Sequence, residues 1–148
     1  MSAPFRRVLQ DQILFSAQAA TGTSTLVLNV TDFRDVVLSF ASASSANLTV
    51  KIQGALGVIG TSNAAGQGEI IAPTFSSSAS ATNAWDYIQA VNLNTGVPVN
   101  GSTGIVYTGT DSVQLYEVNT NALDFLTVTV TAYSAGTLTV KAASSTNL

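Results

Sequence analysis

The sequence predicts an all-β fold: an antiparallel β-sandwich, jelly-roll-like, with about nine strands. Short segments alternate apolar and polar residues with a period of two, which is the side-chain repeat of a strand. Gly, Asn and Ser turn signals separate these segments at short intervals, and no segment shows convincing helical spacing. With 148 residues, 46% of them hydrophobic, the chain can bury one core. We therefore expect an N-terminal arm at residues 1–7 and a single β-sandwich domain at residues 8–148.

The first half of the chain contains three clear alternating segments after an ambiguous start. Residues 8–16 fit either a strand or a short helix. The expected strands follow at residues 26–30, 36–40 and 48–52, with a serine-alanine loop at 41–46. Five glycines between residues 54 and 68 predict a loop there.

The second half begins with weaker signals and then becomes regular. Pro73 limits a short strand at residues 69–75, because proline cannot donate to a sheet ladder. A low-complexity linker follows at 76–83. Further strands are expected at residues 85–93, 104–108 and 113–118. Asn100-Gly101 predicts a tight turn, because both residues tolerate positive φ.

Residues 126–142 show the strongest alternation and predict a hairpin that turns at Ser134-Ala135-Gly136. One face of this hairpin is apolar and the other is rich in threonine. We expect the apolar face to be buried; it comprises Leu126, Val128, Val130, Leu138 and Val140. We expect the other face to be more exposed or to meet a partner; it includes Thr127, Thr129 and Thr139.

The same segment repeats an earlier one. Shifted back by 90 residues without a gap, 126–142 falls on 36–52, and the string LTVK occurs at both Leu48–Lys51 and Leu138–Lys141. The match has two interpretations. It records an internal duplication, or two threonine-rich hairpins resemble each other because both obey the same alternation.

Composition excludes several kinds of chemistry. The chain has neither cysteine nor histidine, so a disulfide framework, a Ser-His-Asp triad and a zinc enzyme are ruled out. The second half has four carboxylates, and nothing in their spacing suggests a catalytic pair; they are Asp86, Asp111, Glu117 and Asp124. We expect no enzymatic activity and no cofactor or metal.

The charge and hydropathy patterns also limit the partners. Only 9% of residues are charged and the net charge is −3, which argues against nucleic acid as a ligand. No apolar run approaches the roughly 20 residues of a membrane helix, and no signal-peptide pattern stands at the N-terminus. We expect the remaining low-charge surface to be partly covered by other protein subunits.

Two groups of residues are candidate assembly contacts. Trp85 and Tyr87 are two residues apart, so they share one strand face, where they could anchor the core, contact a subunit or stack on a sugar. Phe5, Arg6 and Arg7 combine an apolar plug with two cations, which suits an arm that binds a neighbour.

The C-terminal pattern resembles a class of small bacteriophage virion proteins. The resemblance lies in Leu126–Val140, with its Thr-Ala-Tyr-Ser-Ala-Gly-Thr centre, and in the upstream segments Phe33–Phe40 and Thr49–Gly54. It implies a structural protein of jelly-roll or sandwich type. Proteins of this class decorate capsids, often as trimers, or form modules of tails and baseplates.

The leading hypothesis is therefore a capsid decoration (cement) protein. It would bind the major capsid protein on the outside of a phage shell, stiffen the shell, and associate with itself, most simply as a homotrimer. It would be assembled in the host cytoplasm and located in the virion. The first alternative is a tail, baseplate or fibre module. The second is a carbohydrate-binding domain centred on Trp85 and Tyr87.

Overall fold

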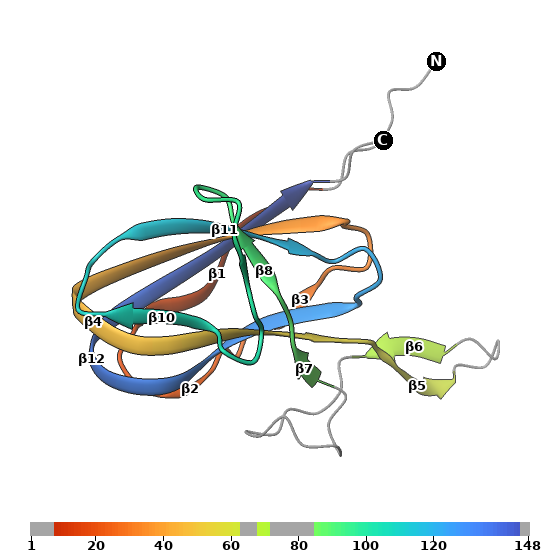
Figure 1. Cartoon of the computed structure of the whole chain (residues 1–148). Helices are drawn as coiled ribbons and strands as arrows, with labels where there is room; N and C mark the ends of the chain where they lie inside the picture. The colour runs from red at the N-terminus through yellow and green to blue at the C-terminus, as the bar shows by residue number, and fades with distance from the viewer. Residues whose placement is uncertain (1–7, 63–67, 72–84, 146–148) are drawn as a thin grey trace.

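The computed structural model describes residues 8–62, 68–71 and 85–145, and in these ranges every regular element is a strand (Figure 1). The all-β antiparallel class is confirmed. The strands are β1 (Val8–Gln18), β2 (Gly22–Thr23), β3 (Leu28–Asn29), β4 (Asp35–Ala55), β5 (Val58–Ser62), β6 (Gly68–Ile71), β7 (Trp85–Tyr87), β8 (Ala90–Asn92), β9 (Pro98–Val99), β10 (Ile105–Thr108), β11 (Val113–Asn119) and β12 (Phe125–Ser145).

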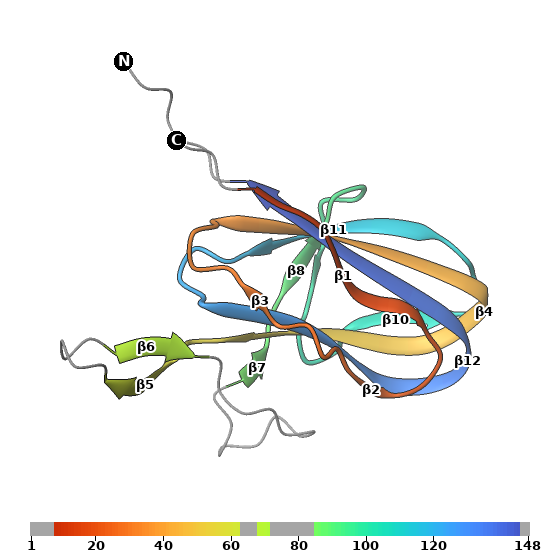
Figure 2. The same cartoon turned by 180° about the vertical axis from the view of Figure 1, so that it is seen from behind.

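A single ten-stranded sheet folds over on itself to make the two layers seen in Figures 1 and 2. The two longest strands, β4 and β12, pair along almost their whole length and bend together at their middles. In layer A, the first half of β4 and the second half of β12 are flanked by β11 and β1, and β8 and β9 extend the sheet beyond β11. In layer B, the other halves are flanked by β10 and β7 on one side and by β2 and β3 on the other.

The predicted hairpin at 126–142 is wrong. These residues form one continuous bent strand, β12, whose hydrogen-bonding partner is β4 and not its own other half. The expected strands 36–40 and 48–52 likewise belong to the single strand β4. A bent strand and a hairpin give the same alternation on either side of a short interruption, so periodicity cannot separate them.

The 90-residue repeat is a structural repeat. Val50 pairs with Val130, and the residues 90 positions away, Val140 and Phe40, also pair with each other. The turns that precede β4 and β12 show the same relation: Phe33 N–H donates to Val30 O at 3.0 Å, and Leu123 N–H donates to Thr120 O at 3.1 Å.

Bonds between the two halves repeat as well. Val30 N–H donates to Asp124 O at 2.8 Å, and Thr120 N–H donates to Arg34 O at 2.7 Å. An approximate two-fold axis therefore passes between the bends of β4 and β12. Shared alternation alone would not reproduce turn hydrogen bonds, so we interpret the repeat as an internal duplication.

The core lies between the layers and contains the predicted apolar face. Leu126, Val128, Val130, Leu138 and Val140 are all buried, as expected. The prediction for the threonine face is wrong in layer B, where Thr127 is 0% and Thr129 7% exposed. The chain between β2 and β3 lies against them, so Thr127 Oγ1 donates to Leu26 O at 3.0 Å and Thr129 Oγ1 donates to Gly22 O at 3.1 Å.

Several element boundaries also differ from expectation. Residues 8–18 are a strand, not a helix, and the strand expected at 26–30 shrinks to β3. The glycine-rich stretch contains strand β5, which pairs with β6 in a separate two-stranded sheet beside the body (Figure 1). The strand expected at 85–93 is two short strands, β7 and β8, which pair with different neighbours. Val8, the first residue of β1, pairs with Ser145, the last residue of β12, so the start of β1 and the end of β12 lie side by side.

Candidate functional site

Trp85 packs inside the chain. It lies on β7, opposite Ala55 of β4, and forms a small apolar cluster with Ala55 and Phe125 on the outer side of layer B. Its side chain is 3% exposed. Of the three roles considered for this ring, the geometry favours an anchor within the chain, because a buried ring presents no platform to a sugar or a subunit.

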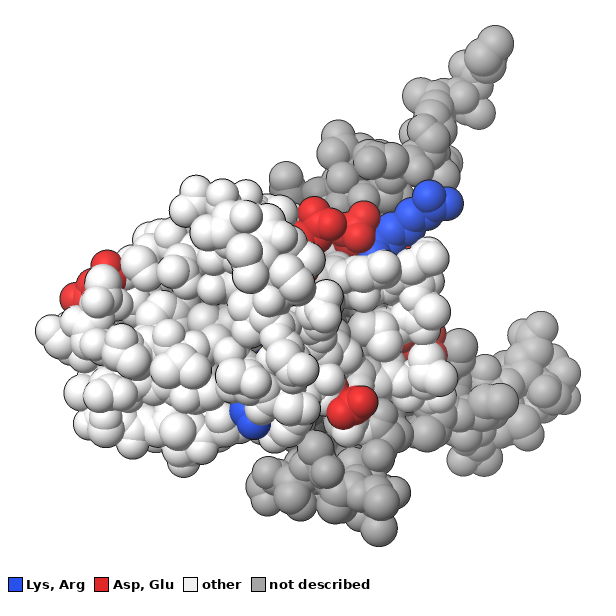
Figure 3. Space-filling view, in the orientation of Figure 1, with Lys and Arg blue, Asp and Glu red and all other residues white. Residues whose placement is uncertain are grey.

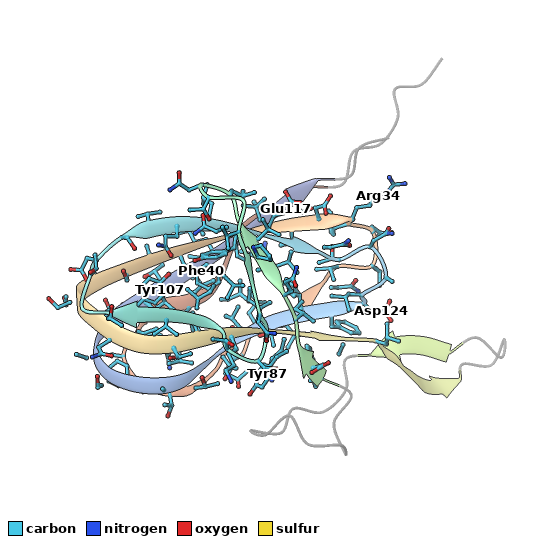
Figure 4. The ribbon with its side chains drawn as sticks, in the orientation of Figure 1. Arg34, Phe40, Tyr87, Tyr107, Glu117 and Asp124 are labelled. Atoms are coloured by element: carbon cyan, nitrogen blue, oxygen red, sulfur yellow. The ribbon has the colours of Figure 1, made fainter. Side chains whose placement is uncertain are left out.

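Tyr87 keeps part of its surface. It lies two residues from Trp85 on β7, opposite Gln53, and the Nζ atom of Lys51 lies 4.6 Å from the centre of its ring. This is cation–π geometry, which is attractive but modest at an exposed site. Figure 4 shows Tyr87 on the side of the molecule away from Glu117. Of the two rings considered for stacking on a sugar, Trp85 is buried and only Tyr87, half-buried, retains an accessible surface.

The arm residues Phe5, Arg6 and Arg7 lie outside the described residues, and their role stays a prediction.

Three of the four carboxylates of the second half accept hydrogen bonds from the backbone. Asp111 accepts from two amides at the bend of β4, Asp124 Oδ2 accepts from Gly57 N–H at 2.7 Å, and Asp86 Oδ1 accepts from Tyr87 N–H at 2.8 Å. Acidic side chains occur at separate places on the surface seen in Figure 3. Among the described residues no group of acidic side chains is placed to hold a metal ion, and none of the elements is a helix that could span a membrane.

A further candidate contact surface, not predicted from the sequence, is the outer face of layer A. Five neighbouring strands, β8, β11, β4, β12 and β1, contribute to it in matching register. One transverse row runs through Leu115, Ser39, Lys141 and Ile13, and Leu93 N–H donates to Leu115 O at the end of that row. The rows on either side add Val91, Glu117, Val37 and Ala143, and Val113, Ala41 and Thr139.

This face carries four of the large apolar side chains that are exposed in the described structure: Ile13, Leu93, Val113 and Leu115. Val113 is 70% exposed. Single exposed apolar residues are ordinary, but neighbouring ones mark an interaction site. Leu93, Val113 and Leu115 are neighbours, whereas Ile13 lies across Ser39 and Lys141 at the other end of its row. A signal was present in the sequence, because β11 is apolar on both faces: Tyr116 and Val118 point inward, while Val113 and Leu115 point outward.

No protein-family model matches the sequence, and no curated protein sequence is significantly similar to it. The fold is similar to that in the crystal structure of the SPBc2 prophage-derived protein YomS. The TM-score is 0.60, the sequence identity is 12%, and the match covers 99% of each chain. At this identity the likeness concerns the fold.

Proposed function

We propose that the protein is a non-enzymatic structural protein of a bacteriophage particle, specifically a decoration protein on the outside of the capsid. The observation that carries this proposal is the fold that the chain shares, end to end, with a prophage-derived protein. The outer face of layer A supports it, because its exposed apolar side chains suit a protein that works in contact with other subunits.

In this proposal the major capsid protein is the partner. The N-terminal arm, with Phe5, Arg6 and Arg7, reaches the shell, while the body packs against other copies. Bound copies add buried area between capsid subunits and so stabilise the shell. The protein is located in the virion and needs no cofactor. A tail, baseplate or fibre module is the alternative that the same fold supports.

The first experiment measures the copy number of the protein in purified particles by quantitative mass spectrometry. A decoration protein should be present in hundreds of copies, comparable with the major capsid protein, because a shell offers many equivalent positions. A handful of copies per particle would instead assign it to the tail or baseplate. Complete absence from particles would overturn the virion role.

The second experiment tests the arm. Undecorated shells are mixed with the full chain or with a chain lacking residues 1–7, and bound protein is measured by co-sedimentation. We expect the truncated chain to bind weakly while its circular dichroism and melting temperature are unchanged, because the arm lies outside the strand pattern. Full binding by the truncated chain would remove the arm from the proposal.

A further inference from the structure

The outer face of layer A has a pattern that fits itself. Its central strand, β4, presents only the short side chains of Val37, Ser39 and Ala41, all half-buried. The larger apolar side chains stand on the flanking strands, with Leu93 beyond β11 and Ile13 beyond β12 in the same row. We propose that this face binds a second copy of the chain, face to face, about a two-fold axis that runs along β4.

Under such an axis β11 of one copy faces β12 of the other, and β8 faces β1. Residues of the same transverse row face each other. Leu93 of one copy then lies opposite the partner's Ile13, so the two outermost apolar side chains of the row meet. Val113 lies opposite the partner's Thr139, Leu115 lies opposite the aliphatic stem of the partner's Lys141, and Ser39 meets its own counterpart. Short side chains along β4 let the two sheets approach, because facing sheets pack about 10 Å apart only when the residues between them interdigitate.

The charges on the face are also complementary under this operation. Glu117 on β11 and Lys141 on β12 lie on opposite sides of β4, one row apart. After the exchange, Glu117 lies one row from the partner's Lys141, a shift of about 7 Å along a strand, which the long lysine side chain can span. Because the interface is isologous, the pair forms twice. The placement of the two charges on opposite sides of β4 is thus complementary to a second copy of the same face.

The internal repeat gives a contrast within the same chain. Lys51 is the residue that corresponds to Lys141, and it lies over the ring of Tyr87 on the outer side of layer B. Layer B also has an exposed valine, Val106 on β10, which is 55% exposed and offers a matched position outside the proposed interface.

The test is the mass of the purified full chain, measured by light scattering and sedimentation velocity over a dilution series that reaches about 100 µM, where a dimer with a micromolar Kd is fully formed. We expect a dimer. Leu93→Asp should raise its Kd by about 100-fold or more, because it places a charge opposite the partner's Ile13, and the contact occurs twice in the dimer. Val106→Asp should leave the Kd unchanged, and circular dichroism should show that both variants are folded.

A charge exchange then tests the register. Glu117→Lys alone and Lys141→Glu alone should each raise the Kd by about tenfold, and the double variant should recover most of the loss. A monomer at the highest concentration, a trimer, equal weakening by Val106→Asp, or no recovery in the double variant would each overturn the proposal. Binding to undecorated shells is measured separately, so failure of the dimer and failure of the virion role are distinguishable.

Discussion

The bends of β4 and β12 occupy equivalent places in the two halves of the molecule, yet they are built differently. In β4 the turn is made by Ser44 and Ser45, both in left-handed conformation with φ of 59° and 55°. Asp111 holds it from another part of the chain, because Ser45 N–H and Ala46 N–H donate to its two carboxylate oxygens at 3.1 and 3.2 Å.

In β12 the bend uses Gly136, whose φ is 80°, and a local contact in which Tyr133 O–H donates to Gly136 O at 2.9 Å. A Cβ atom at Gly136 would lie 2.3 Å from the Cα of Ala46, so glycine is also required by the close approach of the two strands. The comparison shows that the internal repeat sets the position of the bend in each long strand. The residues and hydrogen bonds that stabilise the bend differ between the two strands.

The largest effect is expected from Gly136→Ala. The new methyl group meets backbone atoms of β4 and stands at a φ that alanine disfavours, so we expect a loss of about 3 kcal/mol or more in the free energy of unfolding. Urea denaturation measures it. Ser45→Gly is the matched change in β4 and should alter stability by less than about 1 kcal/mol. Comparable losses for both variants would contradict the difference between the bends.

The next effect tests the long-range support of the β4 bend. Asp111→Ala removes the acceptor for two backbone amides and should lower the free energy of unfolding by about 1–2 kcal/mol. Ala46 is fully buried, so its amide loses its partner, but the exposed position of the carboxylate keeps the effect moderate. Asp86→Ala is the control, since within the described ranges that carboxylate accepts from the neighbouring Tyr87 amide and from no distant part of the chain. If the two variants unfold at the same urea concentration, Asp111 does not hold the bend.

A reciprocal exchange compares the outer faces of the two halves. Val37 and Thr127 are 90 residues apart, but Val37 is half-buried and Thr127 is fully buried. Thr127→Val should cost about 1 kcal/mol, because Leu26 O loses one of its donors. Val37→Thr should change stability by less than about 0.5 kcal/mol. Thermal melts of both variants check this, and the opposite ranking would refute it.

The smallest effect concerns two tyrosines in the core, one of them shown in Figure 4. The hydroxyl of Tyr107 is buried and has no hydrogen-bond partner in the described part of the chain. Burial, and after it the nearby Tyr116, raises the pKa of Tyr107. Tyr107→Phe should therefore stabilise the fold slightly, by up to about 1 kcal/mol.

Tyr116→Phe should have the opposite sign, because the Tyr116 hydroxyl donates to Gln114 Oε1 at 3.0 Å and accepts from Asn92 Nδ2 at 3.3 Å. Calorimetric melting temperatures of the two variants measure the difference. A destabilised Tyr107→Phe variant would show that its hydroxyl has an unseen partner.

Local alternation was enough to predict the β class and the buried face of β12, since Leu126 and Val128 follow the period of two whatever their neighbours are. It could not predict pairing. The bends of β4 and β12 resemble hairpin turns in sequence, because serine and glycine residues occur both in bends within a strand and in turns between strands. The burial of Thr127 depends on Leu26, which is remote in sequence, and the burial of Trp85 depends on Phe125. The outer face of layer A arises only when five strands align.

The pairing of Val8 with Ser145 has a mechanical consequence. These residues lie together at one end of an antiparallel pair, β1 and β12, whose cross-strand bonds run perpendicular to the strands. Tension applied between them opens the bonds one after another, as in a zipper, whereas a pull along the strands in opposite directions loads many bonds together. A force that separates Val8 from Ser145 therefore peels β1 from β12 bond by bond, and a tether that holds both residues side by side protects β1 against such a force.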